Sequence, residues 1–117
     1  MKLTEISRVL EANYIGYVTD SDKEIRRFCG CDLMSDVLSF IKSDALLLTG
    51  LTNLQVVRTA EMADVSAICF VRGKRPPDET IKLAGDKKLP LLGTDLTLYE
   101  CCGRLYGEGL ESCDELK

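Results

Sequence analysis

Eight residues suited to binding an anion lie just after three short apolar runs in the sequence. The runs span residues 45–48, 67–71 and 90–92, and the eight residues are Thr49, Gly50, Thr52, Asn53, Arg72, Gly73, Lys74 and Thr94. Glycine amides and small polar side chains donate hydrogen bonds, and Arg72 and Lys74 add positive charge, which together suit a phosphate group. We therefore predict a binding site for a small anionic ligand, such as a nucleotide or a phosphorylated metabolite. The alternative is that these residues serve only in turns and helix caps.

Few residues are suited to catalysis. The chain has no histidine, so it lacks a Ser–His or Cys–His pair and an imidazole base near neutral pH. It also lacks a P-loop and the Gly-x-Gly-x-x-Gly pattern that binds dinucleotides. These observations favour a protein without catalytic residues over an enzyme. The alternative is a small enzyme in which Arg72 and Lys74 clamp a phosphorylated substrate at the strand ends and Asp95 acts as the base.

The cysteines do not have the spacing of a metal site. Zinc and iron–sulfur sites favour Cys-x-x-Cys pairs, whereas the thiols here form a Cys-x-Cys pair, an adjacent pair and two single residues: Cys29 and Cys31, Cys101 and Cys102, Cys69, and Cys113. We predict that no metal or other cofactor is bound and that most of these thiols are small buried hydrophobes, with Cys69 in the core. Asp32 and Asp36 share a predicted helix face, which favours a solvated surface over a metal or acid–base pair.

Composition limits the partners further. The 117 residues carry 15 Lys+Arg against 19 Asp+Glu, for a net charge of −4, and 6% are aromatic, which argues against a nucleic-acid partner. No stretch approaches the roughly 18–20 consecutive apolar residues that cross a bilayer, and the N-terminal residues lack the pattern of a signal peptide. Cysteines without an export signal indicate reduced thiols. We therefore expect a cytoplasmic protein with no membrane and no nucleic-acid partner.

The order of the apolar patterns predicts an α/β fold. An amphipathic helix opens the chain, the segments 14–18 and 23–28 suggest a hairpin or two edge strands, and the segment 32–41 returns to helical spacing. Each of the three apolar runs then precedes a loop and an amphipathic helix, a pattern typical of a parallel sheet. We predict a single compact domain with a small, mainly parallel sheet flanked by helices. We expect the residues from 107 onward to be frayed or docked on a partner subunit.

Helix caps are predicted in the same loops. Thr52 or Asn53 is placed to cap the helix after the first run, and Pro77 suits the first turn of the next helix. Thr97, three residues before Glu100, has the spacing of a capping box.

Six segments of the chain resemble the stand-alone DRTGG-domain proteins of anaerobic bacteria and archaea. The segments are GCDLMSDVL (30–38), LTGLTN (48–53), QVVRTAEM (55–62), FVRGK (70–74), PLL (90–92) and YECCGRLY (99–106), and the match runs over residues 2–109. The family is similar in fold to the N-terminal domain of HPr kinase/phosphorylase, to the DRTGG module of phosphotransacetylases and to a module between CBS domains in some pyrophosphatases. The resemblance implies a regulatory or assembly role, a DRTGG-like domain at 1–109 followed by an acidic C-terminal tail at 110–117, and no catalytic residue to carry over.

The resemblance and the last predicted helix both indicate a homodimer. Four apolar residues of that helix share one stripe, with two tyrosines beside it: Leu98, Cys101, Cys102, Leu105, Tyr99 and Tyr106. A small sheet with about five helices cannot easily cover every such stripe, and a two-fold dimer is the commonest way to do so. We therefore expect the chain to pair with itself, or to dock on a partner enzyme.

Overall fold

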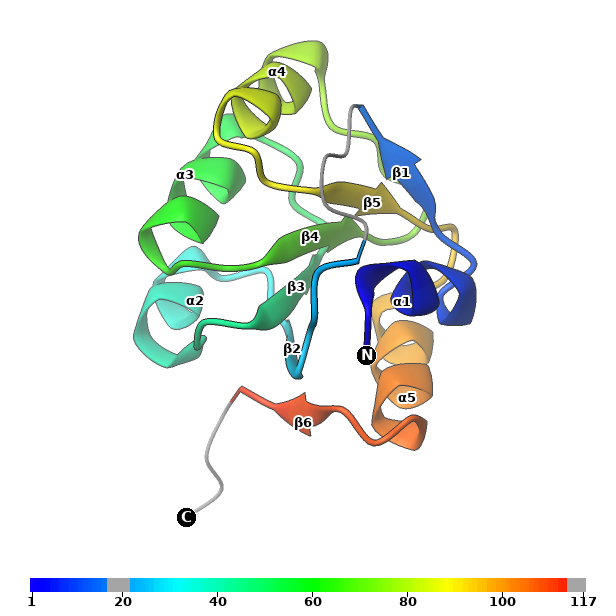
Figure 1. Ribbon diagram of the computed structural model, residues 1–117. Helices are drawn as coiled ribbons and strands as arrows, with labels where there is room; N and C mark the ends of the chain where they lie inside the picture. Colours follow the sequence, from blue (N-terminus) through cyan, green and yellow to red (C-terminus); the bar gives the residue numbers. More distant parts are fainter. Residues whose placement is uncertain (17–21, 114–117) are drawn as a thin grey trace.

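The computed structural model describes residues 1–16 and 22–113, which form five helices and six strands (Figure 1). The helices are α1 (Leu3–Val9), α2 (Met34–Phe40), α3 (Leu54–Met62), α4 (Asp78–Asp86) and α5 (Leu98–Gly107). The strands are β1 (Asn13–Ile15), β2 (Arg27–Gly30), β3 (Ala45–Thr49), β4 (Ala67–Phe70), β5 (Leu91–Gly93) and β6 (Glu111–Ser112). None of the helices in this described part of the chain has the length and apolar character needed to cross a membrane.

The six strands form one sheet in the order β1–β5–β4–β3–β2–β6. Only β1 runs antiparallel to its neighbour, and the other four pairings are parallel. The three apolar runs of the sequence become β3, β4 and β5, which lie side by side. The predicted fold, a single α/β domain with a mainly parallel sheet flanked by helices, is therefore confirmed.

Helices cover both faces of the sheet, with α2, α3 and α4 on one face and α1 and α5 on the other (Figure 1). Neighbouring residues of a strand enter different apolar clusters. Leu47 of β3 packs on the side of α2–α4, whereas Leu46 and Leu48 pack on the side of α1 and α5. Every residue of β3 and β4 is buried, because a parallel strand that is covered on both faces exposes neither.

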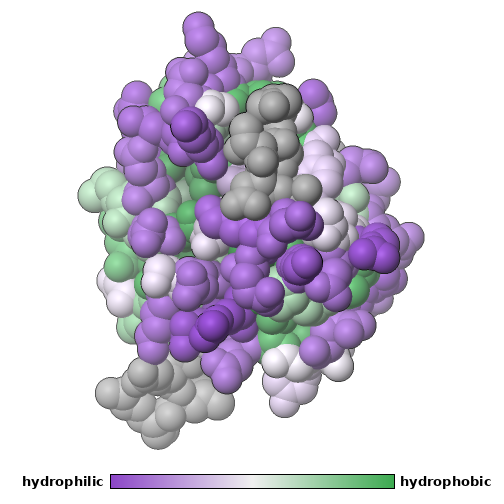
Figure 2. Space-filling view, viewed as in Figure 1, coloured by the Kyte–Doolittle hydropathy of each residue, from purple (hydrophilic) through white to green (hydrophobic). Residues whose placement is uncertain are grey.

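The outer surface is mostly hydrophilic in the orientation of Figure 1, with a paler green edge on the side of α2 and α3 (Figure 2). Leu38 and Phe40 of α2 and Met62 of α3 are exposed large apolar side chains. Single exposed apolar residues of this kind are normal on folded proteins.

The predicted hairpin between segments 14–18 and 23–28 is wrong. β1 pairs with β5 at one edge of the sheet, and β2 lies between β3 and β6 toward the other edge. The other option, two edge strands, holds for β1 alone. Ile15 of β1 and Phe28 of β2 enter different apolar clusters, and each strand pairs with a buried strand of the core, β5 and β3 respectively, and not with the other. The turn formers between them fall largely on residues 17–21, which lie outside the described residues.

The prediction that the chain frays from residue 107 onward is wrong for residues 107–113. β6 pairs in parallel with β2, and the side chains of Leu110 and Cys113 are buried. These two apolar residues in an otherwise polar segment supply the contacts that hold it on the sheet. Residues 114–117 lie outside the described residues.

Helix α5 starts with the predicted cap. The Thr97 hydroxyl oxygen accepts a hydrogen bond from the Glu100 amide at 3.2 Å. Cys101 and Leu105 are fully buried against the sheet and α1, so this part of the apolar stripe is covered within the chain. Leu98 and Cys102 are half-buried, and Tyr99 and Tyr106 are exposed. The side chain that stays exposed on the outer face most clearly is Tyr99, at 87%.

Candidate functional site

The carboxyl ends of β3, β4 and β5 lie side by side at one edge of the sheet. In the strand register Thr49 pairs with Phe70, and Phe70 pairs with Gly93. The three loops that carry the predicted binding residues therefore meet at this edge, where parallel α/β sheets usually bind ligands. β1 starts at the same edge because it runs antiparallel, with Asn13 opposite Gly93.

A tight turn at residues 71–74 holds the cations of this edge. The backbone φ angles are +60° at Arg72 and +68° at Gly73, and the Lys74 amide donates to the carbonyl of the first turn residue at 3.2 Å. This is the geometry of a type I′ turn. The Arg72 and Gly73 amides donate to carbonyls in the loop after β5, both at 2.8 Å. These three backbone hydrogen bonds hold the turn in place, so they also fix the backbone positions of Arg72 and Lys74.

A first pocket lies on one side of this turn, between the ends of β3 and β4, and we call it the β3–β4 pocket. Its volume is about 330 Å³, within the range of roughly 300–1,000 Å³ that is usual for small-molecule sites. It combines one carboxylate, two cations, a glycine and three apolar side chains: Asp32, Arg72, Lys74, Gly50, Leu51, Val71 and Leu98.

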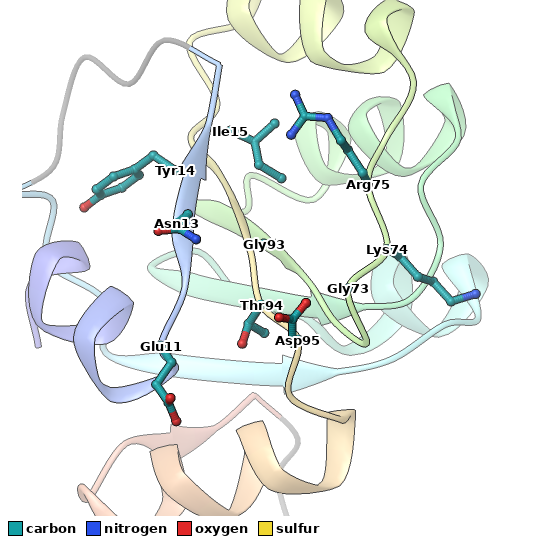
Figure 3. A pocket seen from close by; sticks show the side chains of 10 residues that line it. All are labelled: Glu11, Asn13, Tyr14, Ile15, Gly73, Lys74, Arg75, Gly93, Thr94 and Asp95. Atoms are coloured by element: carbon teal, nitrogen blue, oxygen red, sulfur yellow. The ribbon is translucent and has the colours of Figure 1, made fainter.

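A second pocket lies on the other side of the turn, against β1 and β5, and we call it the β1–β5 pocket (Figure 3). Its volume is about 230 Å³, and it is lined by Glu11, Asn13, Tyr14, Ile15, Gly73, Lys74, Arg75, Gly93, Thr94 and Asp95. Thr94 and Asp95 lie near Gly73, while Lys74 and Arg75 point outward from the turn (Figure 3). Lys74 lines both pockets.

The cations of this edge have no carboxylate partner among the residues that the structure describes. Arg72, Lys74 and Arg75 are exposed, and none of them forms an ion pair within residues 1–16 and 22–113. By contrast, Arg104 on α5 pairs with Glu11 at 2.8 Å. An anion that reaches the turn therefore displaces no ion pair formed within the described part of the chain.

Two predicted binding residues, Thr49 and Thr94, use their hydroxyl groups inside the protein. The Thr49 hydroxyl donates to Asp32 Oδ1 at 2.8 Å and accepts from the Leu51 amide at 3.2 Å. The Thr94 hydroxyl donates to the Leu10 carbonyl at 2.7 Å, in a buried position. Both side chains hold loops in place at the edge of the sheet.

The other predicted residues divide into two groups. One group lines the two pockets at the carboxyl edge of the sheet, where the sequence predicted these residues to meet: Gly50, Arg72, Gly73 and Lys74. Thr52 and Asn53 line neither pocket; the Thr52 carbonyl accepts from the Thr80 hydroxyl at 3.0 Å. Asn53 occupies the N-cap of α3 but makes no side-chain capping bond, so the predicted cap is only positional.

One residue of the β3–β4 pocket, Asp32, was predicted to share a solvated helix face with Asp36, with a metal or acid–base pair as the alternative. It lies before α2, just after the end of β2, and its Oδ1 accepts from both the Thr49 hydroxyl and the Gly50 amide, each at 2.8 Å. The signal in the sequence is its position two residues after a strand, at the same edge as the predicted loops. Asp36, by contrast, lies in α2 and lines neither pocket.

The cysteines lie mostly inside the two apolar clusters. Cys69 is fully buried in β4, as predicted, and burial raises the pKa of its thiol. Burial also raises the pKa of Cys101 to about 11. Within the residues that the structure describes, no group of three or more Cys, Asp or Glu side chains is placed to hold a metal ion.

Comparison with known proteins gives a likeness of fold. No family model and no curated protein sequence matches the chain. A solved structure does match: the CBS and DRTGG domains of the regulatory region of Clostridium perfringens pyrophosphatase, complexed with an activator, diadenosine tetraphosphate. The TM-score is 0.69 at 17% sequence identity. The two share a fold. The match covers 94% of this chain and 47% of the pyrophosphatase chain, so this chain spans about half of that region.

Proposed function

We propose that this chain is a regulatory or assembly module without catalytic activity, a DRTGG-like domain that binds a small anionic ligand at the carboxyl edge of its sheet. The ligand is a nucleotide or another phosphorylated metabolite. The observation that carries the proposal is the turn at residues 71–74. It presents Arg72 and Lys74 between two pockets, and neither cation has an ion-pair partner in the described chain.

The energetics of this edge favour an anion. Hydrogen bonds to charged groups contribute about 1.5–3 kcal/mol each, and the two cations Arg72 and Lys74 line the same β3–β4 pocket. The pyrophosphatase region of the same fold is complexed with an activator that carries phosphate groups, which supports a regulatory role for this chain. The absence of histidine from the sequence supports a binding module over an enzyme.

Self-association is the second part of the proposal, and we assign it to the outer face of α5. A shallow apolar groove of about 600 Å³ lies there, lined by Phe28, Leu98, Tyr99, Cys102, Gly103 and Tyr106. Tyr99 and Tyr106 are 87% and 78% exposed, and, apart from its chain neighbours and the α5 backbone, no described atom lies within 4 Å of the position of a Cβ on Gly103. A second copy of α5 can therefore approach closely at Gly103 while the tyrosines pack on either side, as a two-fold contact requires.

A ligand screen by thermal shift tests the binding proposal. The panel contains nucleotides and phosphorylated metabolites, and a ligand at 100 times its Kd stabilises the protein by about 2.7 kcal/mol. Arg72→Ala should weaken binding of any hit about tenfold or more, because it removes one charge-assisted contact. Arg58→Ala is the matched control, since Arg58 is exposed on α3 and lines neither pocket.

Three results would count against the proposal. If no compound of the panel binds, the proposed anionic ligand is wrong. If Arg72→Ala and the native protein bind a hit with equal affinity, the ligand does not bind at Arg72. Turnover of a phosphorylated hit that is lost in Asp95→Asn would instead support the small enzyme, because Asp95 lines the β1–β5 pocket beside Lys74.

A further inference from the structure

The β3–β4 pocket contains a fixed carboxylate where an anion site would be expected to have none. Asp32 lines this pocket together with Arg72 and Lys74, yet it forms no ion pair within 4.0 Å with either cation in the described chain. A carboxylate at this place repels an approaching phosphate. A ligand that binds here is therefore favoured if it carries, besides its anion, a group that donates a hydrogen bond to the carboxylate.

The hydrogen bonds of Asp32 leave one oxygen available. The Thr49 hydroxyl and the Gly50 amide both donate to Oδ1, each at 2.8 Å. Oδ2 has no hydrogen-bond partner among residues 1–16 and 22–113, and both oxygens lie 3.8 Å from the position of a Cβ on Gly50. The carboxylate is thus held at the end of β3 through Oδ1, with Oδ2 available to accept from a ligand.

The remaining walls of the pocket suit a sugar ring. Leu51, Val71 and Leu98 are apolar and lie around the carboxylate and the two cations. A ribose phosphate matches this pattern, because its hydroxyl groups donate to a carboxylate, its carbon face packs on apolar side chains, and its phosphate binds cations. An acidic residue after a parallel strand that accepts from ribose hydroxyls is a known device of open α/β sheets.

We propose that Asp32 is a specificity residue which selects ligands that carry vicinal hydroxyl groups beside their phosphate, that is, ribonucleotides or ribose phosphates. This inference rests on the proposed function, because it places the phosphate on Arg72 and Lys74. It adds that Asp32 Oδ2 accepts from the hydroxyls, and that an anion without hydroxyls, such as inorganic phosphate, is disfavoured at the same site.

The test is a titration of ¹⁵N-labelled protein followed through the amide signals of Gly50 and Gly73. The probes are ribose 5-phosphate, 2-deoxyribose 5-phosphate and inorganic phosphate, each to millimolar concentration. In the native protein ribose 5-phosphate should bind about tenfold more tightly than the deoxy sugar, since one hydrogen bond to a charged group is lost. Inorganic phosphate should bind more weakly than ribose 5-phosphate.

Asp32→Asn is the decisive variant, because the amide keeps an oxygen that accepts from Thr49 and Gly50 but removes the negative charge and the second acceptor. It should lose the preference for ribose 5-phosphate and bind inorganic phosphate at least as well as the native protein. Asp36→Asn makes the same charge change on α2, outside both pockets, and should keep the native preference.

The outcomes separate this inference from the proposed function. Phosphate probes that bind through Arg72 without any preference for the ribose hydroxyls would overturn the role of Asp32 and leave the anion site standing. A preference that persists in Asp32→Asn would do the same. Probes that leave the Gly50 and Gly73 signals unchanged would overturn both proposals.

Discussion

Replacing Thr94 by Val should destabilise the protein. Thr94 is 4% exposed, and its hydroxyl donates to the Leu10 carbonyl at 2.7 Å and accepts from the Leu96 amide at 3.2 Å. Valine has nearly the same shape but cannot make either bond. A buried polar group that loses its partner costs about 1–3 kcal/mol. Because the Leu10 carbonyl is buried and the Leu96 amide is only partly so, we expect a total loss of about 2–3 kcal/mol.

Chemical denaturation measures this loss. Urea unfolding followed by circular dichroism should give a lower midpoint with an unchanged slope, and Tm should fall by about 4 °C per kcal/mol for a chain of this size. Thr94→Ser is the matched control: it keeps the hydroxyl and loses one methyl group, at a cost of about 1 kcal/mol. The expected order of stability is therefore native, then Thr94→Ser, then Thr94→Val.

Two results would refute this reasoning. If Thr94→Val unfolds within about 0.5 kcal/mol of the native protein, the bond to the Leu10 carbonyl does not stabilise the fold as a buried hydrogen bond should. If Thr94→Val keeps native stability but loses binding of a phosphorylated ligand, the hydroxyl serves the ligand directly, as the sequence alone predicted.

Three further changes test other parts of the molecule. Gly73→Ala should lower the free energy of unfolding in urea by about 1–2 kcal/mol, because φ is +68° and the new Cβ would lie 2.9 Å from Asp95 Oδ1. Gly85→Ala is the control: a Cβ on Gly85 in α4 meets open space, so the free energy of unfolding should stay equal or rise. Burial raises the pKa of Cys101 from an ordinary 9.0 to about 11, because the folded protein favours the neutral thiol. The contribution of this thiol to the free energy of unfolding is therefore complete below pH 9 and is lost as pH rises through 11. In Cys101→Ala the free energy of unfolding should decline less over that range. Tyr106→Arg should convert a dimer to monomer in sedimentation equilibrium, and a native protein that stays at the mass of one chain at all concentrations contradicts the α5 contact.

The parallel core could be predicted because its signal is local. Ala45 to Leu48 and Ala67 to Val71 are continuous apolar runs, and only strands covered on both faces tolerate such runs. The partners of β1 and β6 could not be predicted in this way. Each has only two or three residues, so its place depends on pairing and packing with residues that are distant in the sequence. Ile15 joins the cluster of α2–α4, and Leu110 joins that of α1 and α5, contacts that no short window of sequence contains.

The candidate site was predicted as an edge of the sheet, and its individual roles were not. The sequence shows which residue types follow a strand, and Gly50, Arg72 and Lys74 do line the pockets at that edge. The sequence does not show which side chains already use their hydrogen-bond donors within the protein. The Thr94 hydroxyl, for example, donates to a carbonyl 84 residues away.

The same limit explains Asp32. From sequence its nearest chemical neighbour is Asp36 on the same face, whereas in the fold its carboxylate accepts from Thr49 and Gly50 across the sheet edge. A hydroxyl or carboxylate at such an edge can form its hydrogen bonds within the protein or with a ligand. Counting the hydrogen bonds that it already makes within the protein distinguishes these two roles. By that count the hydroxyl hydrogen of Thr94 and one of its lone pairs are used within the fold, whereas Asp32 Oδ2 has no hydrogen-bond partner among the residues the structure describes.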